Sequence, residues 1–281
     1  MRYAYYPGCS LESVATEYDE SARAVCERLG IELWELEDWS CCGASSGHCT
    51  NLKLSHALPG RNLALAEEQG LDTVAPCPAC FLRLKHTRHA VREDAAVREE
   101  VERLIAMPYE GRFDARNLVD VIINDAGIEE IRRNVVRSLE GLKVVSYYGC
   151  FLVRPPDVVQ FDDAENPQSL DLIMEAIGAT PLDWSSKVDC CGGSLSLTRR
   201  DIVVRLVGDI AAAARDVGAE AMVTACPLCQ SNLESRQGKG PLPVFYFTEL
   251  MGLAFGIPEV RSWFHRHLVS PVALLTSHGL L

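Results

Sequence analysis

Cysteine is the residue type in this sequence whose number and spacing point most clearly to chemistry. Ten of the twelve cysteines form two runs with the same order: a single cysteine, an adjacent pair followed by glycine, and a Cys-Pro-x-Cys segment. The first run consists of Cys9, Cys41, Cys42, Cys77 and Cys80, and the second consists of Cys150, Cys190, Cys191, Cys226 and Cys229. The spacing between the pair and the Cys-Pro-x-Cys segment is identical in the two runs. This agreement indicates an internal duplication.

Five thiols per half are too many for the common metal sites of proteins. A structural zinc ion takes four ligands, and an ordinary cubane iron–sulfur cluster takes four thiolates. The side chains of adjacent cysteines diverge, so such a pair suits two irons of one cluster better than one tetrahedral ion. Gly43, Gly192 and Gly193 would let the backbone approach a bulky inorganic core, and Pro78 and Pro227 each remove a backbone N–H. The pattern favours an iron–sulfur cluster of unusual shape in each half, with zinc sites and disulfides as the alternatives.

Composition limits the compartment and the partners. The 281 residues carry a formal net charge of −12, which argues against a surface for nucleic-acid phosphates or for an anionic membrane. No stretch approaches the roughly 18 uninterrupted apolar residues of a membrane-spanning helix. The amino-terminal residues lack a signal core and a cleavage site, so we expect a cytoplasmic protein. In that compartment disulfides are rare, and cysteine clusters usually bind metal or do redox chemistry.

Hydrophobic patterns predict alternating strands and helices in both halves. Strands are expected at residues 3–6, 31–36 and 73–75, and again at 144–147, 181–183 and 222–224. Helices are expected at residues 13–29, 54–69 and 79–105, and again at 168–177 and 199–217. This alternation predicts an α/β fold of two duplicated half-domains, with parallel sheets related by a pseudo-two-fold axis. Because ligands bind at the carboxyl ends of parallel strands, the five cysteines of one half can converge.

The same patterns divide the chain into three parts. Residues 1–105 are expected to form the first cluster-binding domain, and residues 106–140 a helical connector with a helix at 116–139. Residues 141–281 are expected to form the second cluster-binding domain with a C-terminal helical extension. In that extension, residues 243–267 are expected to contribute one strand and one or two helices.

The two C…CCG…CPxC runs, the opening Y-Y-P-G-C-S and the later E-L-M-G-L-A-F-G (Glu249 to Gly256) resemble the catalytic B subunit of heterodisulfide reductase. The resemblance covers nearly the whole chain. It implies two noncubane 4Fe–4S clusters, one held by the five cysteines of the first run and the other by the five of the second. It also implies two partners, a C-type subunit with cubane clusters and a flavin-containing A-type subunit.

A mechanism follows from the doubled motif. A disulfide accepts two electrons, whereas iron–sulfur clusters deliver electrons singly. Two clusters facing each other across a pseudo-two-fold axis would resolve this mismatch, with the disulfide between them and each sulfur on an iron of one cluster. The expected activity is reduction of a small disulfide, or oxidation of thiols in reverse, with the substrate unidentified. Two other functions stay open: an electron-transfer subunit that relays electrons without disulfide chemistry, and a cluster-bearing assembly subunit of a larger oxidoreductase.

The remaining candidate residues carry weaker signals. Cys26 is expected to be a small buried hydrophobe, and Cys49, without a counterpart in the second half, a structural thiol or one close to the ligands. His48 could deliver a proton to a leaving thiolate, although a lone histidine is more often structural. Trp39 and Trp184 are expected to pack beside the clusters. Five basic residues that follow cluster cysteines could bind an anionic substrate group or lie in solvent: Lys53, Arg61, Arg154, Lys187 and Arg199.

Overall fold

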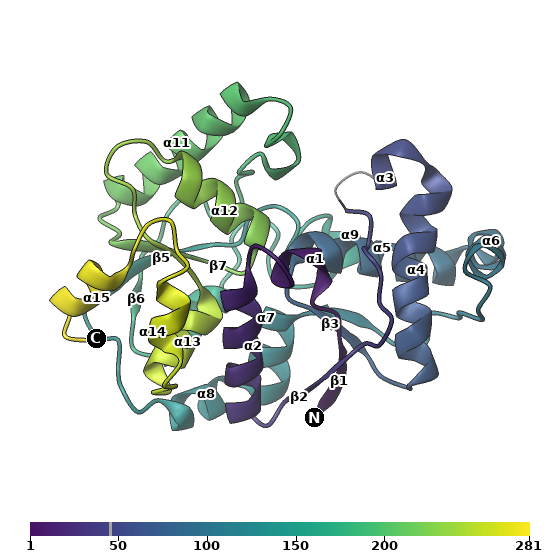
Figure 1. The fold of residues 1–281 in the computed structure, drawn as a ribbon, viewed down its shortest axis with the longest axis horizontal. Helices are drawn as coiled ribbons and strands as arrows, with labels where there is room; N and C mark the ends of the chain where they lie inside the picture. The colour runs from purple at the N-terminus through teal and green to yellow at the C-terminus, as the bar shows by residue number, and fades with distance from the viewer. Residues whose placement is uncertain (45–46) are drawn as a thin grey trace.

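The computed structural model describes residues 1–44 and 47–281, which form two parallel four-stranded sheets covered by helices (Figure 1). The first sheet contains β1 (Arg2–Tyr5), β2 (Glu32–Glu35), β3 (Thr73–Ala75) and β4 (Ala115–Asn117). The second sheet contains β5 (Lys143–Tyr147), β6 (Thr180–Pro181), β7 (Ala221–Thr224) and β8 (Val244–Tyr246). The strand orders β2-β1-β3-β4 and β6-β5-β7-β8 are equivalent. The predicted α/β fold with two duplicated parallel sheets is confirmed.

The helices occupy corresponding places in the two halves. Those of the first half are α1 (Gly8–Leu11), α2 (Thr16–Arg28), α3 (Gly47–Thr50), α4 (Leu52–Glu68), α5 (Pro78–Glu93), α6 (Ala95–Ile105), α7 (Leu118–Val121) and α8 (Ile128–Asn134), with a π-helical turn at Ile122–Ala126. Those of the second half are α9 (Pro156–Val159), α10 (Ser169–Ala176), α11 (Arg200–Asp216), α12 (Pro227–Arg236), α13 (Phe247–Ala254), α14 (Val260–Phe264) and α15 (Val272–Ser277), with a 3₁₀ turn at Gly193–Leu195. Among the described residues, no helix is both long and apolar enough to cross a bilayer.

Two of the predicted helices are wrong in extent. The single helix predicted over residues 79–105 is two helices, because Asp94 adopts an extended conformation and its carboxylate accepts the Ala96 N–H at 2.8 Å, which starts α6. The helix predicted over residues 116–139 begins instead as strand β4, which pairs in parallel with β3. Asn117 then caps α7 through the Val119 N–H at 3.0 Å. The stretch predicted as a helical connector therefore contributes a strand to the first sheet, while the three-part division of the chain stays a prediction.

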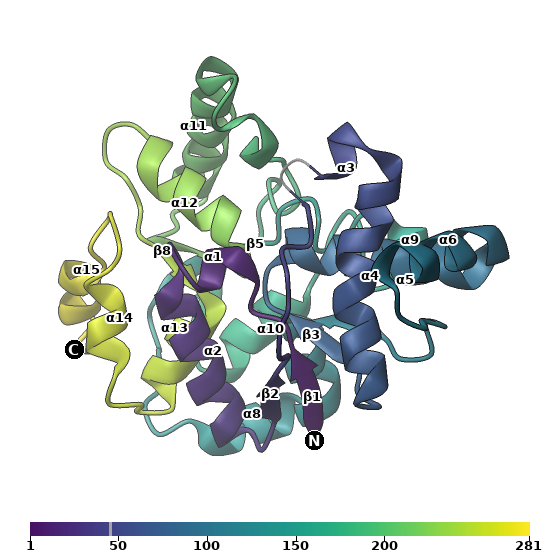
Figure 2. The ribbon, with the colours of Figure 1, turned by 45° about the vertical axis from the view of Figure 1, so that its right-hand side comes forward.

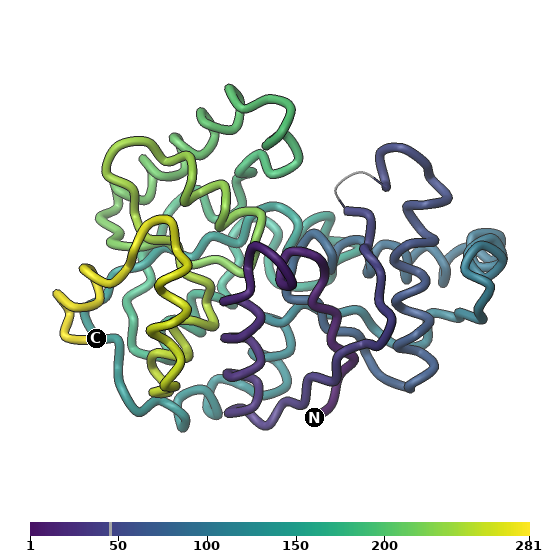
Figure 3. The backbone as a smooth tube through the Cα atoms, viewed as in Figure 1, coloured from purple at the N-terminus to yellow at the C-terminus, as the bar shows by residue number. Residues whose placement is uncertain are grey.

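The two halves share one hydrophobic core. Helix α2 of the first half packs against α13 and α14 of the second, and α10 of the second packs against α7 and α8 of the first. Figures 1 and 2 show α2, from the beginning of the chain, beside α13, from near its end, and Figure 3 traces the same pairing along the backbone. At this contact the rings of Tyr18 and Tyr246 stack 4.2 Å apart, and the hydroxyls of Ser21 and Thr248 share a hydrogen bond of 2.7 Å. The halves are thus joined by buried packing as well as by the chain.

A buried histidine ties the C-terminal extension to the second half. His267 Nδ1 lies 2.8 Å from an oxygen of Glu234 on α12, and Nε2 lies 2.8 Å from an oxygen of Glu249 on α13. The second oxygen of Glu234 accepts the Leu268 N–H, and that of Glu249 accepts the Tyr246 N–H. Burial alone would lower the pKa of His267, but the two carboxylates outweigh it and raise that pKa to about 10. The imidazole is therefore charged between its two partners at neutral pH.

We expect His267→Gln to lower the free energy of unfolding by about 3–5 kcal/mol near pH 6, because a buried charge pair loses one partner. The ordinary histidine pKa is 6.5 and the folded value is about 10, so this contribution is complete below pH 6.5 and is lost as the pH rises through 10. Urea denaturation of wild type and variant at pH 6 and pH 10.5 measures it. A stability difference that stays constant or grows with pH would contradict the charged network.

Candidate metal centres

Each half delivers its five cysteines from the carboxyl ends of three neighbouring strands. The single cysteine follows the middle strand (β1 or β5), the adjacent pair lies in the loop after the edge strand (β2 or β6), and the Cys-Pro-x-Cys segment follows the third (β3 or β7). From the middle strand the chain runs to the edge strand on one side of it (β2 or β6), and then crosses to the strand on its other side (β3 or β7). The cysteines therefore surround the crevice at which the strand order reverses, the usual ligand site of such sheets. The structure brings each set of five together, while their role as metal ligands stays a prediction.

The sulfur atoms make the same contacts in both halves. Cys42 Sγ lies 3.3 Å from Cys80 Sγ, and Cys191 Sγ lies 3.5 Å from Cys229 Sγ. The first sulfur of each adjacent pair accepts the backbone N–H of the following glycine, Gly43 to Cys41 at 3.4 Å and Gly192 to Cys190 at 3.3 Å. In the second half Cys150 Sγ also lies 4.0 Å from Cys190 Sγ. The duplication predicted from the spacing is thus repeated in the arrangement of the thiols.

Burial follows a common gradient from the inside of each site to the surface. The second cysteine of each pair and both cysteines of each Cys-Pro-x-Cys segment are buried: Cys42, Cys77, Cys80, Cys191, Cys226 and Cys229. Cys9, Cys41 and Cys190 are exposed, and Cys150 is half-buried. Each site therefore has a dry inner edge of three thiols and an outer edge that solutes can reach.

The inner thiols lie at helix N-termini. Cys77 precedes α5 and Cys226 precedes α12, and Pro78 and Pro227 occupy the first helical position, where no backbone N–H is needed. Unpaired N–H groups and the dipole at a helix N-terminus favour a thiolate over a thiol. The pKa of Cys77 is lowered, chiefly through its hydrogen bonds to Cys226 and Cys80, whereas that of Cys226 is raised, because its bond to Cys229 is outweighed by the bond to Cys77 and by burial.

Hydrogen bonds between neighbouring thiols shift their pKa values. The hydrogen bonds that Cys42 shares with Cys41 and Cys80 lower the pKa of Cys42, whereas the pKa of Cys41 is raised because it keeps the shared proton. In the second half the bond to Cys229 lowers the pKa of Cys191, and the bond to Cys150 lowers the pKa of Cys190 to about 6. Since metals bind thiolates, the structure already favours the binding form of part of each set.

A cavity of about 40 Å³ lies among the second-half thiols and tests whether the residues fit an iron–sulfur cluster. All five cysteines of the second run line it, together with apolar groups from Pro78, Phe151 and Leu228. Among the described residues, which include all twelve cysteines, every thiol is free, and no three His, Cys, Asp or Glu side chains are arranged around a single ion. A space bounded by five free thiols fits a polynuclear cluster better than the zinc or disulfide alternatives.

Glycine is required at these sites for backbone and packing reasons, while the approach of Gly43, Gly192 and Gly193 to an inorganic core stays a prediction. Gly43 and Gly192 have left-handed backbones (φ of +73° and +79°), and an added Cβ would meet Leu58 and Val203, so they serve a turn and helix packing. A close approach to sulfur occurs at the glycine before each single cysteine. A Cβ on Gly8 would lie 3.0 Å from Cys80 Sγ, and one on Gly149 would lie 3.1 Å from Cys229 Sγ.

A tyrosine–tryptophan pair lies beside each set of thiols. Tyr6 and Trp39 form an edge-to-face pair with centroids 5.3 Å apart, and Tyr147 and Trp184 a tilted pair at 6.2 Å. The hydroxyls of Tyr6 and Tyr147 donate to the carbonyls of the residues before the adjacent cysteines, Ser40 and Asp189. Tyr147, rather than Tyr148, is therefore the counterpart of Tyr6. Both tryptophans lie beside the sites, as predicted.

The two sites lie next to each other. Pro78, which follows Cys77, lines the second-half cavity together with Cys226. The nearness of the two thiols lowers the pKa of Cys77 and contributes to raising the pKa of Cys226. Tyr18, which stacks on Tyr246, lies close to both. The inner edges of the two candidate sites are thus adjacent at the interface between the halves.

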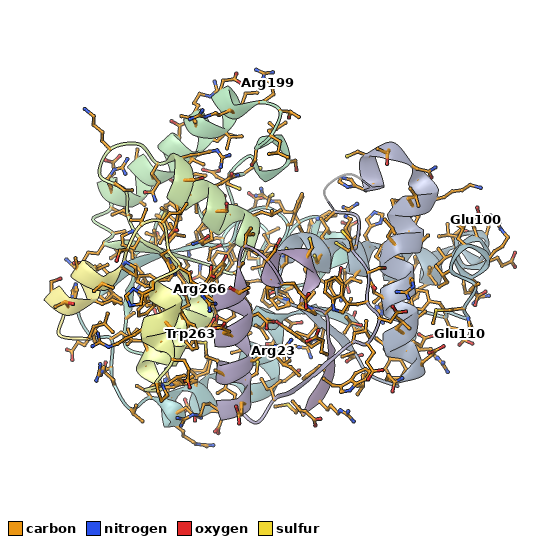
Figure 4. The ribbon with its side chains drawn as sticks, in the orientation of Figure 1. Arg23, Glu100, Glu110, Arg199, Trp263 and Arg266 are labelled. Carbon is orange, nitrogen blue, oxygen red and sulfur yellow. The ribbon has the colours of Figure 1, made fainter. Side chains whose placement is uncertain are left out.

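The basic residues proposed as substrate anchors all have carboxylate partners. Lys53 pairs with Glu100, Arg61 with Asp38, Arg154 with Glu165, Lys187 with Asp171 and Arg199 with Asp201. Figure 4 shows Arg199 at the outer tip of the molecule. Lys187 is instead fully buried, and its carbonyl accepts the N–H groups of Tyr148 and Gly149, so it fixes the backbone that leads into Cys150. The structural interpretation of these residues is favoured.

The two unmatched cysteines differ in environment. Cys26 is buried in α2, where burial raises its pKa, as expected for a small hydrophobe. Cys49 is exposed, and its sulfur lies 3.2 Å from His48 Nε2, while His48 Nδ1 lies 3.4 Å from the Gly43 carbonyl. His48 and Cys49 therefore stand next to the first-half site, and a catalytic role for His48 stays a prediction.

Sequence reasoning missed two residues beside the thiols. Asn232 Nδ2 donates to Cys191 Sγ at 3.6 Å and to the Cys191 carbonyl at 3.4 Å. Arg83 lies near Cys42 and Cys49 in the first half. Both stand three residues after the last cysteine of their run, a spacing that places them on the same helix face as that cysteine. This spacing was the signal that could have found them.

Comparisons with known proteins agree with this duplicated arrangement. The cysteine-rich domain named CCG matches residues 3–85 and 144–234. The chain is 32% identical to the 8-methylmenaquinol:fumarate reductase membrane anchor subunit of Wolinella succinogenes, over 97% of this chain and 98% of that protein. It is 28% identical to a protein of Archaeoglobus profundus that is named for its likeness to the B subunit of heterodisulfide reductase, over 92% of each chain. The resemblance stated from the cysteine runs is thereby confirmed.

One solved structure shares the fold. A hypothetical protein from Helicobacter pylori superposes with a TM-score of 0.73 and 12% identity over 95% of this chain. The chain spans about half of that structure, 51% of its length. This likeness supports the architecture alone.

We expect Cys41→Ser or Cys190→Ser to reduce metal loading only in its own half, because each of these thiols lies at the exposed outer edge of its own site and neither belongs to the Cys77–Cys226 pair at which the sites adjoin. After anaerobic reconstitution, each variant should keep about four iron atoms per chain, the content of one 4Fe–4S cluster. Iron analysis with electron paramagnetic resonance (EPR) measures this. If either single change emptied both sites, the halves would not load independently.

Proposed function

The chain belongs to the family of proteins built on the cysteine-rich CCG domain, and on this basis we propose that it is the disulfide-active subunit of a complex similar to heterodisulfide reductase. Its general role is that of an iron–sulfur oxidoreductase subunit, since the relatives it matches over nearly their whole length are named as reductase subunits. The finer proposal is one noncubane 4Fe–4S cluster in each half. Its ligands are the five cysteines of the first run and the five of the second.

The inner and outer edges of each site would have different roles, exclusion of water at the inner edge and access for the substrate at the outer edge. When bound, each cluster would store and deliver one electron at a time. Cys42, Cys77 and Cys80 hold the inner edge of the first site out of water, and their counterparts do so in the second. The exposed Cys9, Cys41 and Cys190 leave the outer edges accessible to a small thiol or disulfide.

The observation that carries the proposal is that two five-thiol sets, each with an exposed outer edge, lie next to each other in halves that are packed together. Cleaving a disulfide consumes two electrons and two protons and yields two thiols. Sites that adjoin at Cys77 and Cys226 can each contribute one electron to the same bound substrate. The protons can come from water at the outer edge, or through His48, whose ring lies beside Cys49 on that side of the first site.

An electron relay is the second candidate. The name of the relative from Wolinella succinogenes refers to a quinol, to fumarate and to a membrane anchor, and not to a disulfide. A relay needs clusters within transfer distance but no substrate access. The exposed outer thiols favour disulfide chemistry over a sealed relay.

Partners and location belong to the same proposal. The relatives are named as subunits, which supports a multi-subunit complex. We assign the supply of electrons to a C-type iron–sulfur subunit and a flavin-containing A-type subunit, on the cytoplasmic side. An acidic chain of net charge −12 would suit a basic docking face on such a partner.

We expect about eight iron atoms per chain after anaerobic purification or reconstitution, four for each half. Elemental analysis for iron, zinc and acid-labile sulfide measures this. Stoichiometric zinc with little iron would overturn the assignment of both sites.

We expect Cys229→Ala to abolish nearly all disulfide or thiol turnover while leaving the spectrum of the first-half cluster intact, because neither site can supply both electrons alone. The matched control is Cys26→Ala, which removes a buried thiol outside both sets. EPR spectra recorded with and without candidate thiols separate the two functions. Spectra of both clusters that do not respond to any thiol at saturation would favour the relay.

A further inference from the structure

The two sites differ in charge at one equivalent position. Arg83 on α5 and Asn232 on α12 each lie one helical turn after the last cysteine of their run, Cys80 or Cys229. Because residues three apart share a helix face, both side chains lie over the inner thiols. The first site therefore has a guanidinium where the second has a neutral amide.

Arg83 is half-buried, with thiols and imidazoles near its guanidinium. Burial lowers its pKa, Cys42 and Cys49 act in the opposite direction, and Arg83 in turn helps to lower the pKa of His56 and His86. Among residues 1–44 and 47–281, no carboxylate forms an ion pair with Arg83, in contrast to Lys85 with Asp114 and Lys187 with Asp171. A partly desolvated cation without a counter-ion is costly. A negatively charged group held by the first-half thiolates would supply the missing partner.

Asn232 stabilises its site without adding charge. Its amide nitrogen donates to Cys191 Sγ at 3.6 Å, and its oxygen accepts from Ser196 Oγ at 2.9 Å and from Arg236 at 2.6 Å. Arg236 is thus a cation of the second half, but it stands one turn further along α12 and is directed at the amide oxygen. Its effect on the sulfur is therefore weaker than that of a guanidinium in the place of Asn232.

A second equivalent position differs in the same sense. Ser40 precedes Cys41 and Asp189 precedes Cys190, and their equivalence is fixed by the tyrosine hydroxyl that each carbonyl accepts. The Asp189 carboxylate opposes negative charge on Cys190, whereas Ser40 is neutral. Asp189 is exposed, so water screens its effect more than that of Arg83.

We infer that Arg83 and Asp189 make the first-half site the higher-potential site of the pair, so that the first electron resides there and the second-half site is the stronger reductant. Each added electron increases the negative charge of a site, which a nearby cation stabilises and a nearby carboxylate opposes. The inference rests on the proposed cluster in each half. It assigns Arg83 the role of a residue that tunes the site through its charge.

The test is a potentiometric titration of the reconstituted protein followed by EPR. Cys229→Ala and Cys80→Ala, which each leave one site intact, assign the two signals. In the wild type the first-half signal should change at the higher potential. Arg83→Gln should lower that potential and leave the second-half potential unchanged, whereas Arg83→Lys should restore it. Asp189→Ser should raise the second-half potential alone.

The control is Arg92→Gln, the same charge change on an exposed residue of α5 about 13 Å further along the helix. It should shift neither potential. The inference is overturned if the second-half site reduces first, if Arg83→Gln shifts neither potential, or if Arg83→Lys shifts it as far as Arg83→Gln does. Iron and sulfide analysis of the wild type keeps the two proposals separate, because a chain without clusters would refute the proposed function instead.

Discussion

The structure depends on one geometric constraint: thiols that are far apart in the sequence must meet at one point without covalent links between them. Three neighbouring parallel strands satisfy it, because their carboxyl ends lie at one edge and the strand order reverses there. The constraint explains why a helix starts at Cys77 and at Cys226, directly after the short, buried strands β3 and β7, and why glycine precedes each single cysteine. A side chain at Gly8 or Gly149 would occupy the space of an inner sulfur. The thiol positions are therefore properties of the sheet rather than of the loops.

The same constraint makes the two halves inseparable. Each half extends a helix across the interface, α2 onto α13 and α10 onto α7, so the halves share a hydrophobic core that contains Cys42, Cys77 and Cys80, while Cys191, Cys226 and Cys229 lie in a second cluster within the second half. The charged His267 links α12 to α13 through its contacts with Glu234 and Glu249, and α12 is the helix that carries Cys229. The distance between the two sites is thus set by packed side chains and buried ion pairs. A flexible connection between two independent modules could not fix it.

Cysteine spacing predicted the duplication, the parallel sheets and the convergence of each thiol set, because covalent order and strand polarity together leave few alternatives. Local patterns failed where tertiary pairing decided the outcome. Residues 116 and 117 were expected to begin a helix, yet they belong to strand β4, which pairs with β3, and only comparison with β8 of the second half could have shown this. Nothing in the sequence indicated the packing at Gly43, where an added Cβ would meet Leu58, and the approach of Gly43 to an inorganic core stays a prediction. Arg83 and Asn232 were missed because nothing in their residue types marks them until the helix face that they share with cysteines is known.

Duplication alone would give two sites with the same reduction potential. Neither site would then be reduced before the other. Reaction with a disulfide requires two electrons to leave together, but a partner with single-electron clusters delivers them one after the other. The first electron must therefore stay on the protein until the second arrives. It is retained better at a site with a higher reduction potential than at one with a lower reduction potential. Substitutions at equivalent positions, Arg83 against Asn232 and Ser40 against Asp189, break the pseudo-symmetry in a single direction while leaving all ten thiols in place. Under the proposed function the ten cysteines would provide the capacity for two electrons, and the residues next to them or one helical turn away would set the order in which the two sites are reduced.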